Sequence, residues 1–401
     1  MSRRRLPLLA ALAALVALCG AAGSASAQAG RMGDVERLAP GVTPPKIVLI
    51  TIGRGALIFE KFGHSALCLD YAEPERDTVC FNYGTTDFSV APQTLIWNFV
   101  RGTQKFYVEP VPLGGMVRFY QREDRTMWRQ DLPLTPEQAR AMEAELLDDL
   151  KPENRFYVYD HFADNCTTKL RDIIDRSTGG ALKVGTGGAF SSTFRQMGIR
   201  GMAELPPLIA FGDFGVGRAL DRHPTLWEAM FHPFVLREEV RVRYSAEPRL
   251  IYERRGPPIP EDGSTGRLWA LLIGLTFAVP LLLARLTGRA ERAAVAVAAI
   301  PVALVGLIIW TAAIVSQIPA LRWNEALFLY TPFDLALPIL GERSRRRYAR
   351  VRLGMVVAVS LLRGLGVFRQ PLWVPITIVF VIFGLCAVDK LPRWPWSRAK
   401  G

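Results

Sequence analysis

The apolar and polar positions of the first half of the chain follow short, strand-like runs. Such runs cover residues 46–52, 62–69, 78–83, 106–111 and 126–132. Helical spacing of apolar residues then appears after Thr135 and Pro136, and again after Asn165. We therefore expect an α+β domain in which a group of strands is followed by helices.

The second half has a different pattern. A Pro- and Gly-rich linker at residues 254–266 leads into apolar runs at 268–284, 293–318, 327–340, 351–365 and 372–388. A membrane helix needs about 20 apolar residues, so only the second run is long enough by itself. Five spans nevertheless place all three basic segments of this half on the cytoplasmic side. This agreement predicts a five-span membrane bundle, in which Asp334 and Arg363 are charges at membrane depth or near its edge.

The first residues have the form of a secretory signal peptide. Arg3, Arg4 and Arg5 precede an apolar run at 6–18, and Ala27 ends a small-residue cleavage site. The predicted organisation is a signal peptide at 1–27, an exported catalytic domain at 28–253, the linker at 254–266, a transmembrane bundle at 267–390 and a basic cytoplasmic tail at 391–401. Most of the formal net charge of +12 lies beside apolar runs. That distribution indicates membrane topology and argues against nucleic-acid binding.

The five cysteines are used unequally. Cys19 leaves with the signal peptide and Cys386 lies in an apolar run, so the exported domain keeps Cys68, Cys80 and Cys166. A hairpin that is symmetric about residue 74 places Cys68 opposite Cys80, and a disulfide there leaves Cys166 as a free thiol. A shift of one residue in the register would remove this pairing.

Cys166 lies in the first turn of its predicted helix, where Asp164 or Asn165 serves as the N-cap. The helix dipole favours a thiolate there, and a thiolate needs a base. His64 is the candidate base, because it lies on a strand among apolar residues, and Asn82 is the candidate group that orients its ring. The alternative is that Cys166 and His64 are two ordinary buried polar residues.

The other three histidines carry weaker signals. His161 lies in the loop before the Cys166 helix, where capping or packing is the expected role. His223 and His232 have too few candidate co-ligands to predict a metal site.

Two motifs resemble the Lnb family of bacterial lipoprotein N-acyltransferases. They are Phe62-Gly63-His64-Ser65-Ala66-Leu67 with Asn82-Tyr83-Gly84-Thr85, and the segment 157–172 around Asp164-Asn165-Cys166-Thr167-Thr168. The similarity covers about residues 45–240, and Arg322-Trp323-Asn324-Glu325-Ala326-Leu327 resembles the membrane half of the family more loosely. Lys169 stands where the family often has an arginine.

The resemblance implies a circularly permuted NlpC-type, papain-like fold, with Cys166 as nucleophile, His64 as base and no cofactor. It implies that Cys166 takes an acyl chain from a phospholipid or lipoprotein ester and passes it to the N-terminal amine of a diacylated lipoprotein. The implied location is the bacterial inner membrane, with several spans and a periplasmic N-terminal domain.

Three other functions remain open at this stage. A cell-wall cysteine peptidase or amidase would use the same pair of residues but would need at most one span. A thioesterase or lipase would pass the acyl group to water. A non-enzymatic exported sensor or scaffold would tolerate replacement of Cys166.

Overall fold

The computed structural model describes residues 40–56, 60–71, 73, 76–87, 89–260 and 265–388. The predicted signal peptide and the basic tail lie outside these residues. The described chain forms two compact units. The first contains residues 40–99, 103–187 and 227–256, and the second contains 100–102, 188–226 and 257–388. Residues 188–226, which lie inside the predicted exported domain, thus cluster with the second unit, and the domain boundaries themselves stay a prediction.

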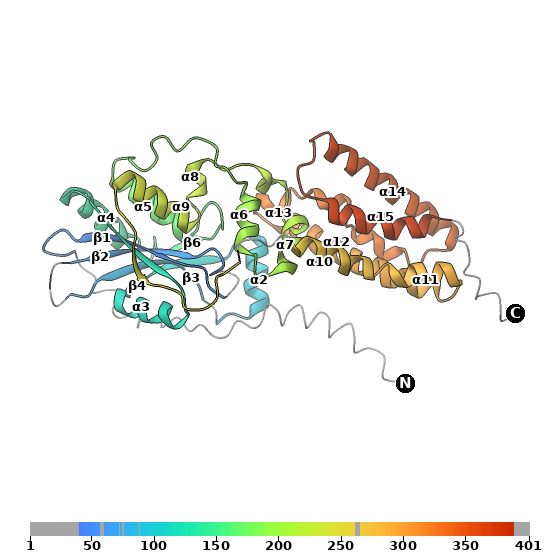
Figure 1. Cartoon of the computed structure of the whole chain (residues 1–401), viewed down its shortest axis with the longest axis horizontal. Coiled ribbons are helices and arrows are strands. Elements are labelled where there is room, and N and C mark those ends of the chain that lie inside the picture. Colours follow the sequence, from blue (N-terminus) through green and yellow to red (C-terminus); the bar gives the residue numbers. More distant parts are fainter. Residues whose placement is uncertain are drawn as a thin grey trace. The chain divides into compact units, whose positions relative to one another are not determined.

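One antiparallel sheet organises the first unit (Figure 1). Its strands follow the order β6-β4-β3-β2-β1-β5-β7. Their bounds are β1 (Lys46–Ile52), β2 (His64–Asp70), β3 (Val79–Thr85), β4 (Lys105–Pro112), β5 (Met127–Leu132), β6 (Phe156–Val158) and β7 (Arg249–Tyr252). The five predicted strands are all present, whereas β6 and β7 were not predicted.

Helices cover both faces of this sheet because side chains alternate along each strand. Leu67 and Phe81 belong to the core shared with three helices on one face, whereas Ala66 and Cys68 pack with a helix on the other. The first face carries α4 (Pro136–Asp148), α5 (Cys166–Ser177) and α9 (Pro233–Tyr244), and the second carries α3 (Leu113–Arg122). The remaining helices are α2 (Pro92–Arg101), whose last residues belong to the second unit, and the short α8 (Leu226–Ala229).

The β2–β3 hairpin has the predicted register. Cys68 lies opposite Cys80, and the two form a disulfide. Cys166 and Cys386 are the free cysteines of the described residues. The prediction that Cys166 keeps a free thiol is confirmed.

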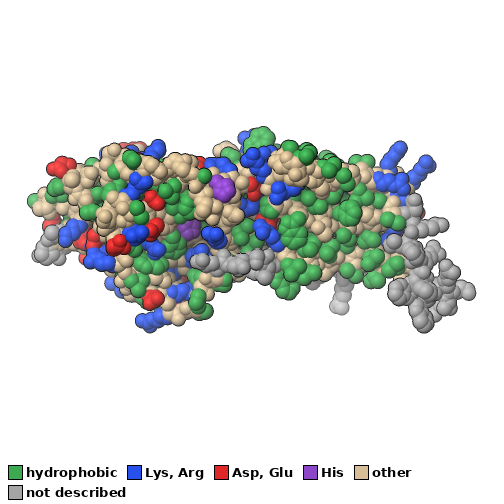
Figure 2. Space-filling view, turned by 45° about the horizontal axis from the view of Figure 1, so that its top comes forward, with side chains coloured by type: hydrophobic (Ala, Val, Ile, Leu, Met, Phe, Trp, Pro, Cys, Tyr) green, Lys and Arg blue, Asp and Glu red, His purple; other side chains and the backbone are tan. Residues whose placement is uncertain are grey.

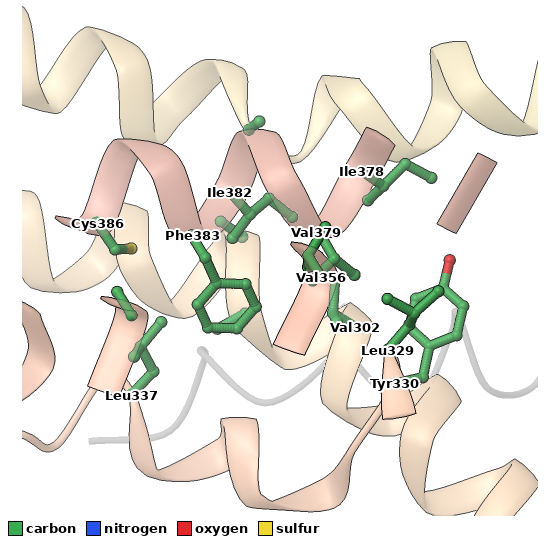
Figure 3. Close-up of a cluster of buried hydrophobic side chains, with 14 of the residues drawn as sticks. Val302, Leu329, Tyr330, Leu337, Val356, Ile378, Val379, Ile382, Phe383 and Cys386 are labelled. Atoms are coloured by element: carbon green, nitrogen blue, oxygen red, sulfur yellow. The ribbon is translucent and has the colours of Figure 1, made fainter. Parts of the chain in front are cut away.

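The second unit is helical. Its core is built from the apolar side chains drawn in Figure 3, among them Val302, Val356, Val379 and Phe383. Its elements are α6 (Phe194–Gly201), α7 (Pro206–Gly215), η3 (Arg218–Asp221), α10 (Thr265–Thr276), α11 (Val279–Thr287), α12 (Glu291–Val315), α13 (Pro319–Arg322), η4 (Glu325–Phe328), η5 (Pro332–Ala336), α14 (Glu342–Gly364) and α15 (Trp373–Ala387).

Two segments in the described residues are long and apolar enough to cross a membrane, Gly266–Thr287 and Glu291–Val315. Only 17 % and 44 % of their apolar windows are buried, so much of their hydrophobic surface faces outward (Figure 2). A buried core helix would hide most of that surface, and a membrane helix would present it to lipid. α15 is apolar but shorter. The predicted five-span bundle is not confirmed.

The third predicted span is wrong, because residues 327–340 do not form a continuous helix. This run contains the end of η4 and the 3₁₀ helix η5, joined by turns. Pro332 lacks an amide hydrogen and disfavours helical geometry at Thr331, and the Thr331 side chain instead caps the amide of Phe333. Pro338 follows in the same run. Apolar composition therefore suggested a continuous helix that this segment does not form.

The charge at Asp334 has a partner that the sequence did not reveal. Asp334 is fully buried, and its Oδ1 lies 3.0 Å from Nε of Arg352 on α14. Tyr348 donates a hydrogen bond of 2.8 Å to the same carboxylate. Arg363, in contrast, lies in an exposed environment near the carbonyl of Phe368. The charge of the buried Asp334 carboxylate is thus balanced by the neighbouring Arg352 guanidinium.

Candidate active site

His64 is placed by a tight turn before β2. Gly63 has a φ of +85°, and a Cβ at this position would lie 2.7 Å from the carbonyl oxygen of Ile52. Only glycine fits such a conformation and such an approach without strain. The Phe62-Gly63-His64 sequence therefore brings the imidazole to the first position of the strand.

Asn82 on β3 holds the His64 ring. Nε2 of His64 and Oδ1 of Asn82 form a hydrogen bond between neighbouring strands. With the amide oxygen as acceptor, Nε2 carries the proton and donates it, which leaves the other ring nitrogen, Nδ1, as the basic one. The structure therefore brings together the two residues that the sequence paired.

Cys166 is the first residue of α5, and Asn165 is the N-cap. Oδ1 of Asn165 accepts the amides of Thr167 and Thr168, each at 2.9 Å. Thr168 completes a capping box by accepting the Asn165 amide at 2.7 Å. Because Asn165 also donates to the carbonyls of His161 and Phe231, the cap is tied to two loops. The position of Cys166 is thus fixed from several directions.

The strand and the helix meet at Gly84. This glycine lies at a register shift between Tyr83 and Thr85, with a φ of +96°. A Cβ built there would lie 3.5 Å from Cβ of Cys166 and 3.9 Å from Cε1 of His64. The β-bulge thus leaves an open point in the sheet around which the cysteine and the histidine converge.

The charges of Cys166 and His64 support each other. Burial by itself raises the pKa of the Cys166 thiol, but the charge and hydrogen bond of His64, the Thr167 hydroxyl and the Ser65 amide lower it, and the net shift is downward. Burial lowers the pKa of His64, but the Cys166 charge and the hydrogen bonds of Cys166 and Asn82 raise it, with a net upward shift. Both shifts favour a thiolate–imidazolium pair, the reactive form of a cysteine nucleophile.

The other buried histidines do not share this chemistry. Burial lowers the pKa of His161 to about 4 and that of His232 to about 3, so both rings are neutral near pH 7. The His161 ring centroid lies 4.2 Å from that of Phe62, and Nδ1 of His232 accepts the Phe234 amide. Packing and capping are therefore their roles, while His223 contacts the Phe190 carbonyl.

A further residue at this point is Tyr157 on β6. Its hydroxyl oxygen lies 4.0 Å from the same built Cβ at Gly84. Sequence reasoning gave this residue no role, because a strand of three residues carries too little periodicity to place a side chain. The neighbouring Tyr159 differs, because its hydroxyl forms a hydrogen bond of 3.1 Å with His161.

Metal ligands are not grouped at this site. The described ranges contain no cluster of three or more His, Cys, Asp or Glu side chains able to hold a metal ion.

One family model matches the chain. Residues 42–197 match the family model described as the Lnb N-terminal periplasmic domain, and this range includes His64, Asn82 and Cys166. No curated protein and no solved structure shows a significant match to the chain. The chain is therefore similar to the Lnb family over this domain, which contains the whole of the candidate site.

Proposed function

We propose that this protein is a membrane-bound acyltransferase that moves an acyl chain through a thioester on Cys166 to the N-terminal amine of a diacylated lipoprotein. The similarity of residues 42–197 to the Lnb N-terminal periplasmic domain supports a role in lipoprotein processing, and the two candidate membrane helices support association with a membrane. The observation that carries the finer proposal is the free Cys166 thiol at the start of α5, beside the His64–Asn82 pair and with a lowered pKa.

In the first half-reaction, the Cys166 thiolate attacks the carbonyl carbon of a phospholipid acyl ester. A carbon–sulfur bond forms, the ester carbon–oxygen bond breaks, and the His64 imidazolium gives its proton to the departing alkoxide. The products are an acyl thioester and a lysophospholipid.

In the second half-reaction, the free amine of the lipoprotein attacks the thioester carbonyl. Neutral His64 accepts the amine proton as the carbon–nitrogen bond forms, and the carbon–sulfur bond then breaks to return the thiolate. An ester and an amine become an amide and an alcohol, so no cofactor is required to balance the reaction.

The amide of Cys166 is a donor for the negatively charged oxygen that forms in both steps. The amides of Thr167 and Thr168 bond to Oδ1 of Asn165, and that of Lys169 bonds to the Asn165 carbonyl. In the described structure, the Cys166 amide is the first-turn donor left for a reacting oxygen. A preorganised donor of this kind contributes about 10²- to 10³-fold to the rate of acyl transfer.

A permuted NlpC-type, papain-like architecture is part of the proposal. Two features support it: the strand histidine precedes the helix cysteine in the chain, and the cysteine helix packs on an antiparallel sheet.

The proposal is tested with purified protein in vesicles whose phospholipid carries isotopically labelled acyl chains, together with a synthetic diacylated lipopeptide that has a free N-terminal cysteine. We expect the label to appear as an amide on the lipopeptide and an equal amount of lysophospholipid to form. Cys166→Ala should abolish both products, and a lipopeptide with an acetylated N-terminus should accept no label.

Other results would replace the proposal. Labelled free fatty acid without labelled lipopeptide would indicate a lipase or thioesterase. Cleavage of cell-wall peptides without acyl transfer would indicate a peptidase. Equal products with wild type and Cys166→Ala would refute a role for the thioester.

A further inference from the structure

The Tyr157 hydroxyl is buried and has no hydrogen-bond partner among the described atoms. The Tyr157 oxygen is inaccessible to solvent, and no described atom lies in position to accept its proton. A buried hydroxyl of this kind costs about 1–3 kcal/mol unless another group pairs with it. Its presence at a candidate site therefore points to a partner that arrives with the substrate.

The Tyr157 hydroxyl lies near the side chains of Cys166 and His64. The point defined by a Cβ on Gly84 lies 4.0 Å from the Tyr157 oxygen, 3.5 Å from Cβ of Cys166 and 3.9 Å from Cε1 of His64. Because Gly84 has no side chain, nothing of its own occupies this point. The Tyr157 oxygen, the Cys166 side chain and the His64 ring thus surround one point.

The neighbouring tyrosines differ from Tyr157. The Tyr159 hydroxyl contacts Nδ1 of His161 at 3.1 Å, and the Tyr83 hydroxyl donates to Asp149 at 2.5 Å. Both have protein partners, and only the hydroxyl of Tyr157 among these three is left for a substrate.

The Tyr157 hydroxyl stays protonated at any working pH. Burial and, after it, the charge of Cys166 raise the pKa of Tyr157 far above its usual value, and the Gly84 amide opposes this rise. The residue is thus a hydrogen-bond donor and not a base. The Lys169 ammonium lies 4.7 Å from the centre of its ring. A cation over a phenol ring withdraws electron density and strengthens the hydroxyl as a donor.

We propose that the Tyr157 hydroxyl donates a hydrogen bond to the oxyanion that forms when the Cys166 sulfur attacks an acyl carbonyl. It acts together with the Cys166 amide, so that two donors converge on one oxygen. The proposal rests on the proposed function in one respect, namely that Cys166 becomes acylated. Tyr157 is then a catalytic residue, because its hydroxyl contacts a reacting atom.

Tyr157→Phe removes the hydroxyl and keeps the ring with its contacts to Lys169 and Phe106. The full-length protein in detergent is mixed with p-nitrophenyl butyrate, and the burst of p-nitrophenolate reports acylation of Cys166. We expect Tyr157→Phe to lower the acylation rate constant about 10²-fold, with the apparent dissociation constant of the ester within about 2-fold of wild type. Tyr159→Phe, the matched control, should acylate within about 3-fold of the wild-type rate.

A second measurement separates catalysis from disturbance of the site. The pH dependence of Cys166 alkylation by iodoacetamide reports the thiolate and requires no oxyanion. It should be the same in Tyr157→Phe and in wild type. An acylation rate near that of wild type, or an alkylation rate that falls in the same proportion as acylation, would overturn the proposal.

The activated ester also keeps this test distinct from that of the lipid function. If wild type acylates with p-nitrophenyl butyrate but gains no acyl chain from phospholipid vesicles, the proposed function fails while the role of Tyr157 is still measured. If wild type gives no burst at all, Cys166 is not acylated and both proposals are wrong.

Discussion

The two units of this protein each bury polar groups, but in different ways. In the helical unit, the buried carboxylate of Asp334 is engaged by Arg352 and Tyr348, and Arg352 also donates to the Phe328 carbonyl at 3.0 Å. In the sheet unit, the thiol of Cys166 faces His64, and the Tyr157 hydroxyl has no acceptor among the described atoms. Burial of a charge therefore does not by itself mark a functional site. The proposed site differs by its free thiol and by a hydroxyl with no acceptor among the described atoms.

The largest expected effect is the loss of chemistry when the reactive pair is broken. Cys166→Ala and His64→Ala should each lower acyl transfer by at least about 10³-fold, because nucleophile and base act as a unit. Thermal unfolding should change little for Cys166→Ala, since the half-buried thiol contributes little to the core. Activity assays with labelled phospholipid and calorimetry on the same samples check this. Residual transfer above a tenth of wild type would contradict the assignment.

A change in the helical unit should lower the stability of the protein and leave the acylation rate unchanged. Arg352→Met leaves the Asp334 carboxylate buried without its charge partner, which costs about 3–5 kcal/mol of stability. The double change Asp334→Leu with Arg352→Met should recover most of that loss. The measurement is thermal unfolding in detergent, with acylation by p-nitrophenyl butyrate measured below the transition. An unaltered unfolding temperature for Arg352→Met would show that the ion pair is not structural.

Asn82→Ala should have an intermediate effect, because His64 loses the group that orients its ring. Misplacement of a catalytic group by about 1 Å costs about 10²-fold in rate. The hydrogen bond of Asn82 also contributes to the raised pKa of His64. That pKa should fall in the variant, so the alkaline limit of the thiolate–imidazolium pair should move to lower pH.

The pH dependence of iodoacetamide alkylation in wild type tests the lowered pKa of the Cys166 thiol beside His64. Because the pKa of Cys166 is lowered, its thiolate should react at pH values where a free cysteine, with a pKa of about 8.5, is protonated. His64→Ala should shift this reaction to higher pH. An alkylation midpoint at or above 8.5 in wild type would contradict the electrostatic description.

The smallest expected effect concerns a helix cap away from the site. Thr135→Ala removes the capping box of α4, in which the Thr135 side chain accepts the Gln138 amide. A loss of about 1 kcal/mol of stability is expected, with no change in acylation rate. Chemical denaturation and the p-nitrophenyl butyrate burst measure the two quantities on one sample. A changed acylation rate would mean that α4 influences the site.

The sequence predicted those features whose signals are local. The Thr135 capping box and the Asn165 cap are formed by side chains within four residues of the amides they bind. The pairing of Cys68 with Cys80 followed from the position of one turn. The proximity of His64, Asn82 and Cys166 was expected from the chemistry of a thiol that needs a base.

The features that sequence reasoning missed depend on the tertiary structure. Strand β6 has three residues, and its partner β4 lies far away in the chain, so neither it nor the placement of Tyr157 had a local signal. Residues 327–340 had the composition of a span, but Pro332 and the buried Asp334–Arg352 pair determine their actual path. Strand register and charge partners depend on contacts between residues that lie far apart in the chain.

The most direct test of the central claim is the mass of the protein after incubation with phospholipid vesicles. Wild type should gain the mass of one acyl chain on the peptide that contains Cys166, and hydroxylamine should remove it because thioesters are labile to this reagent. Cys166→Ala and His64→Ala should gain none. An adduct that resists hydroxylamine, or one that forms equally on Cys166→Ala, would contradict the claim that Cys166 carries the acyl chain.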